Sequence, residues 1–355
     1  MLFGSELILW ILSLGTGKAK KSSNHFQKEQ LFSYRNPSAY DQSVQLPRLN
    51  RLTGLRWWRS RPPQGSDGQN SRQIQEAAIR KMILQRAPCA IGKIGTSELF
   101  VLEFPHRWIR LPWPASASWR RPAKRLFQSG GLFPVKKQIF DRFLIEYREA
   151  VKSLDMVAEW QTENTYEAAV EHAMVESLCP HAVRVGFFLV KILNPHAPWL
   201  NDLATLRWLV IHPFAQTIRA QLPNLSKLGV YSSAAKSHLQ DRALDTSIIP
   251  CPQLPYMVPP RHRDWFEALD DLKAQMERET FDIALVGAGA WSLPLVAHAK
   301  KLGKKGIHLG GSLQLLFGIK GGRYDNNGIY NEAWTRPLPS EVPPNFKKME
   351  EGAYW

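Results

Sequence analysis

The sequence has few cysteines and none of the common catalytic or metal-binding motifs. Its three cysteines form no CxxC pair, so we expect a reducing compartment, without a disulfide framework or a zinc site. The patterns GxSxG, HExxH, the EF-hand loop and the P-loop do not occur, and GTGK at 15–18 lacks the Walker spacing. These absences exclude the best-known hydrolase, metalloprotease and NTPase signatures.

The sequence also lacks an apolar run long enough to span a membrane. The run Leu7–Leu14 is far below the roughly 20 residues that a transmembrane helix needs. Glu6 precedes it, where a secretory signal would carry positive charge. We therefore expect no transmembrane span and a cytoplasmic location. The basic cluster at 18–21 leaves a peripheral membrane contact open.

Negative charge is scarce in the front third of the chain. Residues 1–135 hold 21 Lys/Arg and 7 Asp/Glu, whereas residues 136–355 hold 25 and 24, out of a total net charge of +15. Such a basic segment can contact RNA or an anionic membrane surface, or it is a solvated extension. We expect residues 1–71 to be a poorly ordered extension because Arg, Trp, Pro, Gly and Ser alternate there without a period.

Short apolar segments alternate with amphipathic segments from residue 72 onward. The pattern predicts helices at 71–87, 136–154, 164–180, 214–225, 263–281 and 293–302, and strands at 89–92, 155–160, 208–212, 281–286 and 304–309. Residues 104–130, rich in Pro, Trp and Arg, are predicted to be a loop or insertion, and 324–355 an irregular tail. This alternation predicts one α/β domain over 72–355, with a mostly parallel, Rossmann-like open sheet.

Two glycine pairs follow the last two predicted strands. Gly287 and Gly289 come after the first strand, and Gly310 and Gly311 after the second. Ligands of open α/β sheets bind at such strand ends. Ser292 stands where the dinucleotide fingerprint has its third glycine, and no acidic residue ends the second strand, so NAD is not expected. A different nucleotide or phosphate site, or close packing alone, remains open.

Polar residues near the second glycine pair are candidate ligand contacts. Lys320 and Arg323 could pair with a diphosphate, and Gln314 lies between them and the glycines. His308, on the strand itself, is either a site residue or a core histidine. Three residues are accessory candidates: His212, before Pro213, and Asn331 and Trp334 in the tail. The alternatives are turn formation for His212 and surface packing for the two tail residues.

The segment IGKIGTSEL places a carboxylate directly after an earlier strand. It contains Lys93, Gly95, Thr96 and Glu98. Glu98 is a candidate general base or metal ligand. The alternative is structural, since Thr96 can cap the next helix and a glutamate in the first turn is stabilised by the helix dipole.

These segments, together with VIHPFAQTIRAQ and YNEAW, resemble the GT-D-type glycosyltransferases and their uncharacterised relatives that have a GGxxQxxFGIKG segment. The resemblance covers about residues 72–355. It implies transfer of a sugar from a nucleotide-sugar donor to a glycan, lipid or protein acceptor. It also implies that Lys93, Gly95 and Thr96, with the later glycine turns, line the donor site.

The resemblance departs from the family at one position. The family's Asp-x-Glu motif, which is linked to metal and donor handling, corresponds here to Thr96, Ser97 and Glu98. Threonine is a poor ligand for Mn²⁺ or Mg²⁺ because hard cations prefer carboxylates. Three hypotheses follow: a glycosyltransferase using Glu98, a non-catalytic nucleotide- or glycan-binding module of the same fold, and an RNA-associated protein that binds through residues 1–135.

Overall fold

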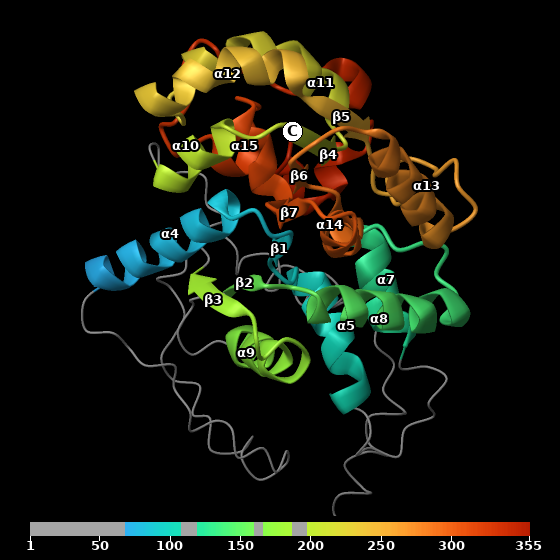
Figure 1. The fold of residues 1–355 in the computed structure, drawn as a ribbon. Coiled ribbons are helices and arrows are strands. Elements are labelled where there is room, and N and C mark those ends of the chain that lie inside the picture. Colours follow the sequence, from blue (N-terminus) through green and yellow to red (C-terminus); the bar gives the residue numbers. More distant parts are fainter. Residues whose placement is uncertain (1–67, 108–118, 160–165, 187–196) are drawn as a thin grey trace, which may run out of the picture. The chain divides into compact units, whose positions relative to one another are not determined.

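The computed structural model describes residues 68–107, 119–159, 166–186 and 197–355 (Figure 1). The predictions made for residues 1–67 lie outside the described residues. Within the described part, no helix combines the length and the apolar character that crossing a membrane requires.

Seven strands form one fully parallel sheet in the order β3-β2-β1-β7-β6-β4-β5. The strands are β1 (Cys89–Gly92), β2 (Met156–Glu159), β3 (Val183–Gly186), β4 (Trp208–His212), β5 (Ser247–Pro250), β6 (Ile283–Val286) and β7 (Lys305–His308). The central strands are almost entirely apolar because both faces of a parallel sheet are covered. In β1, Ala90 enters one core, and Cys89 and Ile91 enter the other.

Helices cover both faces of the sheet (Figure 1). The first face carries α5 (Thr96–Arg107), α7 (Arg120–Ser129), α8 (Lys137–Lys152), α9 (Tyr166–Leu178), α13 (Trp265–Arg278) and α14 (Ser292–Lys301). The second face carries α4 (Gly68–Leu84), α10 (Pro198–Ala204), α11 (Ala215–Gln221), α12 (Ser233–Asp245) and α15 (Leu313–Leu316).

The connections between strands all have the same hand. Those that lead toward β3 cross the first face, through α5, α7 and α8, through α9, through α13, or through α14. Those that lead toward β5 cross the second face, through α10 or through α11 and α12. This is the behaviour expected of right-handed crossovers. As a result, the segments that follow the central strands β1, β7, β6 and β4 leave the sheet toward alternate faces.

The chain after α15 forms short 3-10 turns and extended pieces, as predicted for 324–355. They include η9 (Pro339–Glu341), η10 (Phe346–Lys348) and η11 (Glu350–Gly352). Glu341 fixes this tail to the start of α11. Its buried carboxylate accepts the backbone N–H groups of Gln216, at 2.7 Å, and Thr217, at 3.0 Å, and the Thr217 hydroxyl. The tail is therefore held at the carboxyl edge of the sheet, where β4 ends.

The predicted fold class is confirmed, and the predicted strands correspond to β1, β2, β4, β6 and β7. The elements β3, α10 and α12 were not predicted, and β5 lies in the segment 247–260, which was read only as extended and rich in proline. The segment 104–130, predicted to be a loop or insertion, contains the end of α5 and all of α7, and its residues 108–118 lie outside the described residues. α7 is helical because Pro122, Ala123 and Leu126 lie at helical spacing and are buried. Its many charged residues conceal that pattern in the sequence.

Candidate functional site

The candidate residues of three segments meet at the carboxyl edge of the sheet. β1, β7 and β6 are parallel neighbours, so the turns that follow them lie side by side. The turn after β1 leads into α5 on the first face, and the turn after β7 leads into α15 on the second face. In open α/β sheets, such divergence creates the crevice in which ligands bind.

Lys93 joins the turn after β1 to the turn after β7. Its Cε lies 3.5 Å from the position that a β-carbon would take on Gly310, and His308 Cε1 lies 3.6 Å from that position. Burial lowers the pKa of the Lys93 ammonium, which the charges of Glu98 and Glu171 partly oppose. The Lys93 ammonium therefore lies within electrostatic reach of Glu98 while its stem contacts the Gly310 turn.

Glu98 is buried in the first turn of α5. Its side chain is 7% exposed, and its carboxylate folds back over Gly95, where a β-carbon would clash with Oε2. Burial raises the pKa of this carboxyl. A hydrogen bond from its own backbone N–H and the charges of Lys93 and Arg125 act in the opposite direction. This geometry fits a first-turn acid that is stabilised by the helix, and it also leaves a carboxyl group with a raised pKa beside a cation.

Two buried histidines flank the turn after β6. His212 ends β4, and its Nδ1 accepts the Phe214 backbone N–H at 3.0 Å. Burial lowers the pKa of His212 to about 3, so the ring is neutral and its proton is on Nε2. His308 ends β7, and its Nδ1 lies 3.3 Å from both the Gly310 nitrogen and the Val286 carbonyl oxygen. Burial, followed by the charge of Lys93, lowers its pKa to about 3.

The glycines of the β6 turn are required by packing. A β-carbon on Gly287 would lie 2.8 Å from the Gly310 carbonyl oxygen and 2.8 Å from His212 Cδ2. Gly289 has φ +54°, and its β-carbon would lie 2.9 Å from the Gly130 carbonyl oxygen. The Gly287 N–H donates to the Ile211 carbonyl, and the Gly310 N–H donates to His308. These two amides are therefore already used within the fold.

The segment after Gly311 is engaged by the residues of η11 and those that follow it. Arg323 forms an ion pair with Glu350 and lies 4.4 Å from the centroid of the Tyr354 ring. The Tyr354 ring also covers Gly311, since a β-carbon there would lie 2.5 Å from Cε1. Arg323 was predicted to pair with a diphosphate. In the structure its partner is the Glu350 carboxylate, which lies where a phosphate group would be expected to bind.

The other predicted residues are distributed around this tail. Lys320 lies 5.5 Å from the centroid of the Tyr330 ring and is not among the groups acting on Lys93. Gln314 is fully buried, and its Nε2 donates to the carbonyls of Ile319 and Tyr354, at 3.2 Å each.

Asn331 and Trp334 have structural surroundings. Asn331 Nδ2 donates to the Lys227 carbonyl, and its Oδ1 accepts the Ala333 N–H. Trp334 is buried and packs on Tyr330, with ring centroids 4.9 Å apart. These contacts match the packing alternative for both residues.

Sequence reasoning missed several residues that surround Glu98. Tyr147 of α8 is buried, and its pKa is raised by burial and by the charge of Glu98, while a backbone hydrogen bond at Gly95 opposes the rise. Arg125 acts on Glu98 from α7. Tyr147 lies in the helix predicted at 136–154, in which no side chain was singled out, and Arg125 lies in the segment predicted to be a loop or insertion.

The surroundings of Glu98 do not fit a divalent metal ion. Within the four described ranges, no group of three or more His, Cys, Asp or Glu side chains could hold one. The charged neighbours that act on Glu98 are the cations Lys93 and Arg125, whereas Mn²⁺ and Mg²⁺ require several oxygen ligands.

Comparison with known proteins does not assign a family. No family model matches the chain, and no curated protein matches it. A similar solved structure is described as the selenomethionine-substituted structure of domain of unknown function 1792. It shares 12% identity with a TM-score of 0.35, over 79% of this chain and 98% of that chain. Similarity at this level carries no argument about function.

Proposed function

We propose that the chain binds a nucleotide-sugar at the carboxyl edge of β1, β7 and β6 and transfers the sugar to an acceptor hydroxyl. The observation that carries this proposal is the position of Lys93. It contacts the Gly310 turn and interacts electrostatically with Glu98. Lys93 and Glu98 both follow β1, and they place a cation and a carboxyl group beside the Gly310 turn, where the chains after β1 and β7 diverge.

Lys93 would neutralise the diphosphate of the donor. A buried ammonium is costly without nearby negative charge, and Glu98, Glu171 and Glu350 now supply that charge. An incoming diphosphate would replace the Glu350 carboxylate beside Arg323. Arg323 would then present a planar guanidinium to phosphate oxygens, for which its geometry is well suited.

In the transfer step, the acceptor oxygen forms a bond to the anomeric carbon of the sugar. The bond from that carbon to the diphosphate oxygen breaks, and its electron pair leaves with the diphosphate. Glu98 takes the hydroxyl proton of the acceptor, which a carboxyl group with a raised pKa can do as a general base in its ionised form. Lys93 and Arg323 stabilise the departing negative charge. The proposal assigns no step to a metal ion.

The test is a panel of nucleotide sugars, assayed for binding by calorimetry and for transfer or hydrolysis, with and without Mn²⁺ or Mg²⁺. We expect Lys93→Met to weaken binding of the preferred donor at least tenfold and Lys93→Arg to restore part of it. Lys320→Met removes a nearby lysine that lies over Tyr330 and should leave binding unchanged. No binding to any donor, or equal effects of Lys93→Met and Lys320→Met in folded protein, would contradict the proposal.

A second candidate is a nucleotide- or glycan-binding module without catalysis. It is favoured by the backbone hydrogen bond that the Glu98 carboxylate accepts from its own residue, because this bond ties the carboxylate to the start of α5, a use that needs no catalysis. Donor binding without turnover, unchanged in Glu98→Gln, would support this candidate. Turnover that is lost in Glu98→Gln would instead support the transferase.

A further inference from the structure

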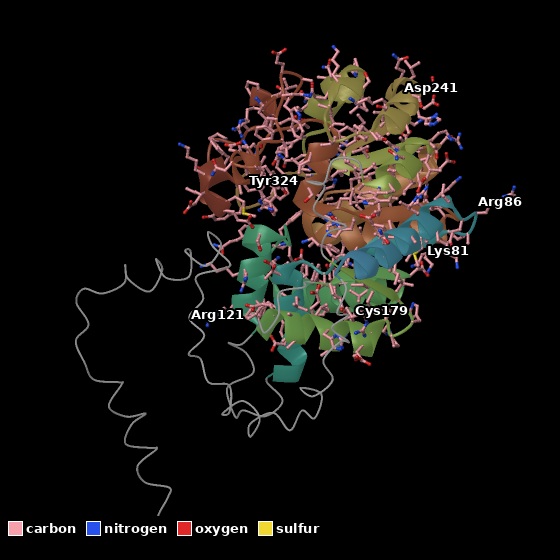
Figure 2. The ribbon with its side chains drawn as sticks, turned by 90° about the vertical axis from the view of Figure 1, so that its left-hand side faces the viewer. Lys81, Arg86, Arg121, Cys179, Asp241 and Tyr324 are labelled. Carbon is pink, nitrogen blue, oxygen red and sulfur yellow. The ribbon has the colours of Figure 1, made fainter. Side chains whose placement is uncertain are left out.

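α7 presents a concentrated basic face to solvent. Arg120, Arg121, Lys124 and Arg125 are all exposed, and α7 contains no acidic residue. With 3.6 residues per turn and a rise of 1.5 Å per residue, the four cations lie within an arc of about 140° and an axial length of about 7.5 Å. Arg121 lies at the periphery of the fold in Figure 2.

These cations are not neutralised by the described part of the chain. None of the four forms an ion pair with a described Asp or Glu, although Arg125 contributes to the field at Glu98. The neighbouring helix α8 differs, since Lys137 pairs with Asp141 at 2.5 Å and Glu146 pairs with Lys273 at 3.0 Å. The positive charge of α7 is thus available to an external anionic partner.

We propose that this face of α7 docks on an anionic membrane surface. A membrane leaflet rich in anionic lipid offers a planar field of negative charge, which attracts clustered Lys and Arg side chains without requiring insertion. α7 cannot insert, because Pro122, Ala123 and Leu126 on its opposite side are buried in the core. The contact is therefore electrostatic and sensitive to salt.

The surroundings of α7 favour a membrane over a nucleic acid. Single-stranded RNA is bound by basic grooves with open aromatic rings on which bases stack. The rings at the two ends of α7 are already in contact with other rings. Trp119 lies 6.1 Å from Phe140, and Phe127 lies 6.2 Å from Tyr256, between ring centroids.

α7 ends beside the candidate site. Ser129 Oγ is 2.5 Å from Ser97 Oγ, and the β-carbon position of Gly130 lies 3.1 Å from Glu98 Oε1. A membrane held by α7 would therefore lie next to the carboxyl edge of β1. The docking itself does not depend on the proposed transfer reaction.

The test is cosedimentation of the full chain with phosphatidylcholine vesicles over a series of NaCl concentrations. The vesicles contain either no anionic lipid or roughly 30% phosphatidylglycerol, which gives them a negative surface charge. We expect binding only to the anionic vesicles. Because each cation contributes about fivefold to partitioning, a variant with Arg120, Arg121, Lys124 and Arg125 all replaced by Gln should lose most of this binding. The double variant Arg121→Gln/Lys124→Gln, which changes only two exposed residues, should lose about 25-fold.

A matched control replaces four exposed cations elsewhere in the described fold, Lys81, Arg86, Arg219 and Lys347, by Gln. It removes the same charge and should retain most of the binding. Equal loss in the control and the α7 variant would overturn the proposal, as would an absence of binding to anionic vesicles. Binding of a 20-mer RNA that is lost in the α7 variant while vesicle binding persists would also overturn it, in favour of a nucleic acid partner.

Discussion

Replacing the glycines of the carboxyl edge with alanine separates a packing role from a ligand role. Gly289→Ala adds a β-carbon 2.9 Å from the Gly130 carbonyl oxygen, at φ +54°. The left-handed conformation costs about 1–2 kcal/mol and the overpacking about 1–3 kcal/mol, which gives about 2–5 kcal/mol of destabilisation. Gly287→Ala meets the Gly310 oxygen at 2.8 Å without backbone strain and should cost about 1–3 kcal/mol.

Two further substitutions calibrate the series. Gly310 has φ +56°, and the atoms nearest its β-carbon position are at 3.5 Å and 3.6 Å, which is ordinary contact. Gly310→Ala should therefore cost only the conformational strain, about 1–2 kcal/mol. Gly229 has no atom within 4 Å of that position and no positive φ, so Gly229→Ala should be neutral or stabilise by about 0.4–1 kcal/mol.

The assay is urea unfolding, in which a change of midpoint at constant slope reports a change in stability. We expect the order of destabilisation Gly289, then Gly287, then Gly310, then Gly229. If Gly289→Ala were as stable as Gly229→Ala, the packing argument would be refuted. If Gly287→Ala kept its stability but lost nucleotide-sugar binding, Gly287 would serve close approach to a ligand instead.

Three other predictions concern His212 and the tail. Burial lowers the pKa of His212 to about 3, whereas a histidine of the unfolded chain titrates near 6.5. The unfolded chain therefore binds a proton first, and stability should fall as pH drops from about 6.5 toward 3. His212→Asn should flatten this dependence in urea midpoints taken at pH 7, 5 and 4, and an unchanged dependence on pH would argue against a neutral ring. Glu341→Ala leaves the hydrogen bonds of Gln216 and Thr217 unmade and should cost about 2–4 kcal/mol in thermal unfolding, whereas the exposed Glu332→Ala should cost little. Glu350→Gln removes the carboxylate paired with Arg323 and should tighten pyrophosphate binding several-fold in calorimetry; an unchanged affinity would mean that Glu350 does not compete with a phosphate.

The sequence predicted the central strands because their residues are buried on both faces. Edge strand β3 escaped prediction because Val183 is exposed and Arg184 is partly exposed, so its apolar pattern is incomplete. α7 escaped because burial of only Pro122, Ala123 and Leu126 fixes it, within a segment whose composition favours a loop.

For the candidate site, local sequence identified the residues on the turns but not their tertiary partners. Lys93, Glu98 and His308 follow or end adjacent strands, and parallel pairing brings them to one edge. The groups that interact with them come from distant segments: Arg125 acts on Glu98, Glu350 acts on Lys93, and Glu98 acts on Tyr147. Lys320, which is close to the glycines in sequence, lies over the Tyr330 ring and is not among the groups that act on Lys93.

The position of β6 and β7 in the sheet has a consequence for how the chain folds. These strands, between residues 283 and 308, lie between β1 on one side and β4 on the other. During synthesis, the β1–β2–β3 and β4–β5 groups therefore emerge before the strands that join them. β1 and β4 each expose an unpaired edge over that interval, and such edges favour association between chains. The two groups become one sheet only when residues 283–308 insert between them, so we expect this late, non-local step to limit the folding rate.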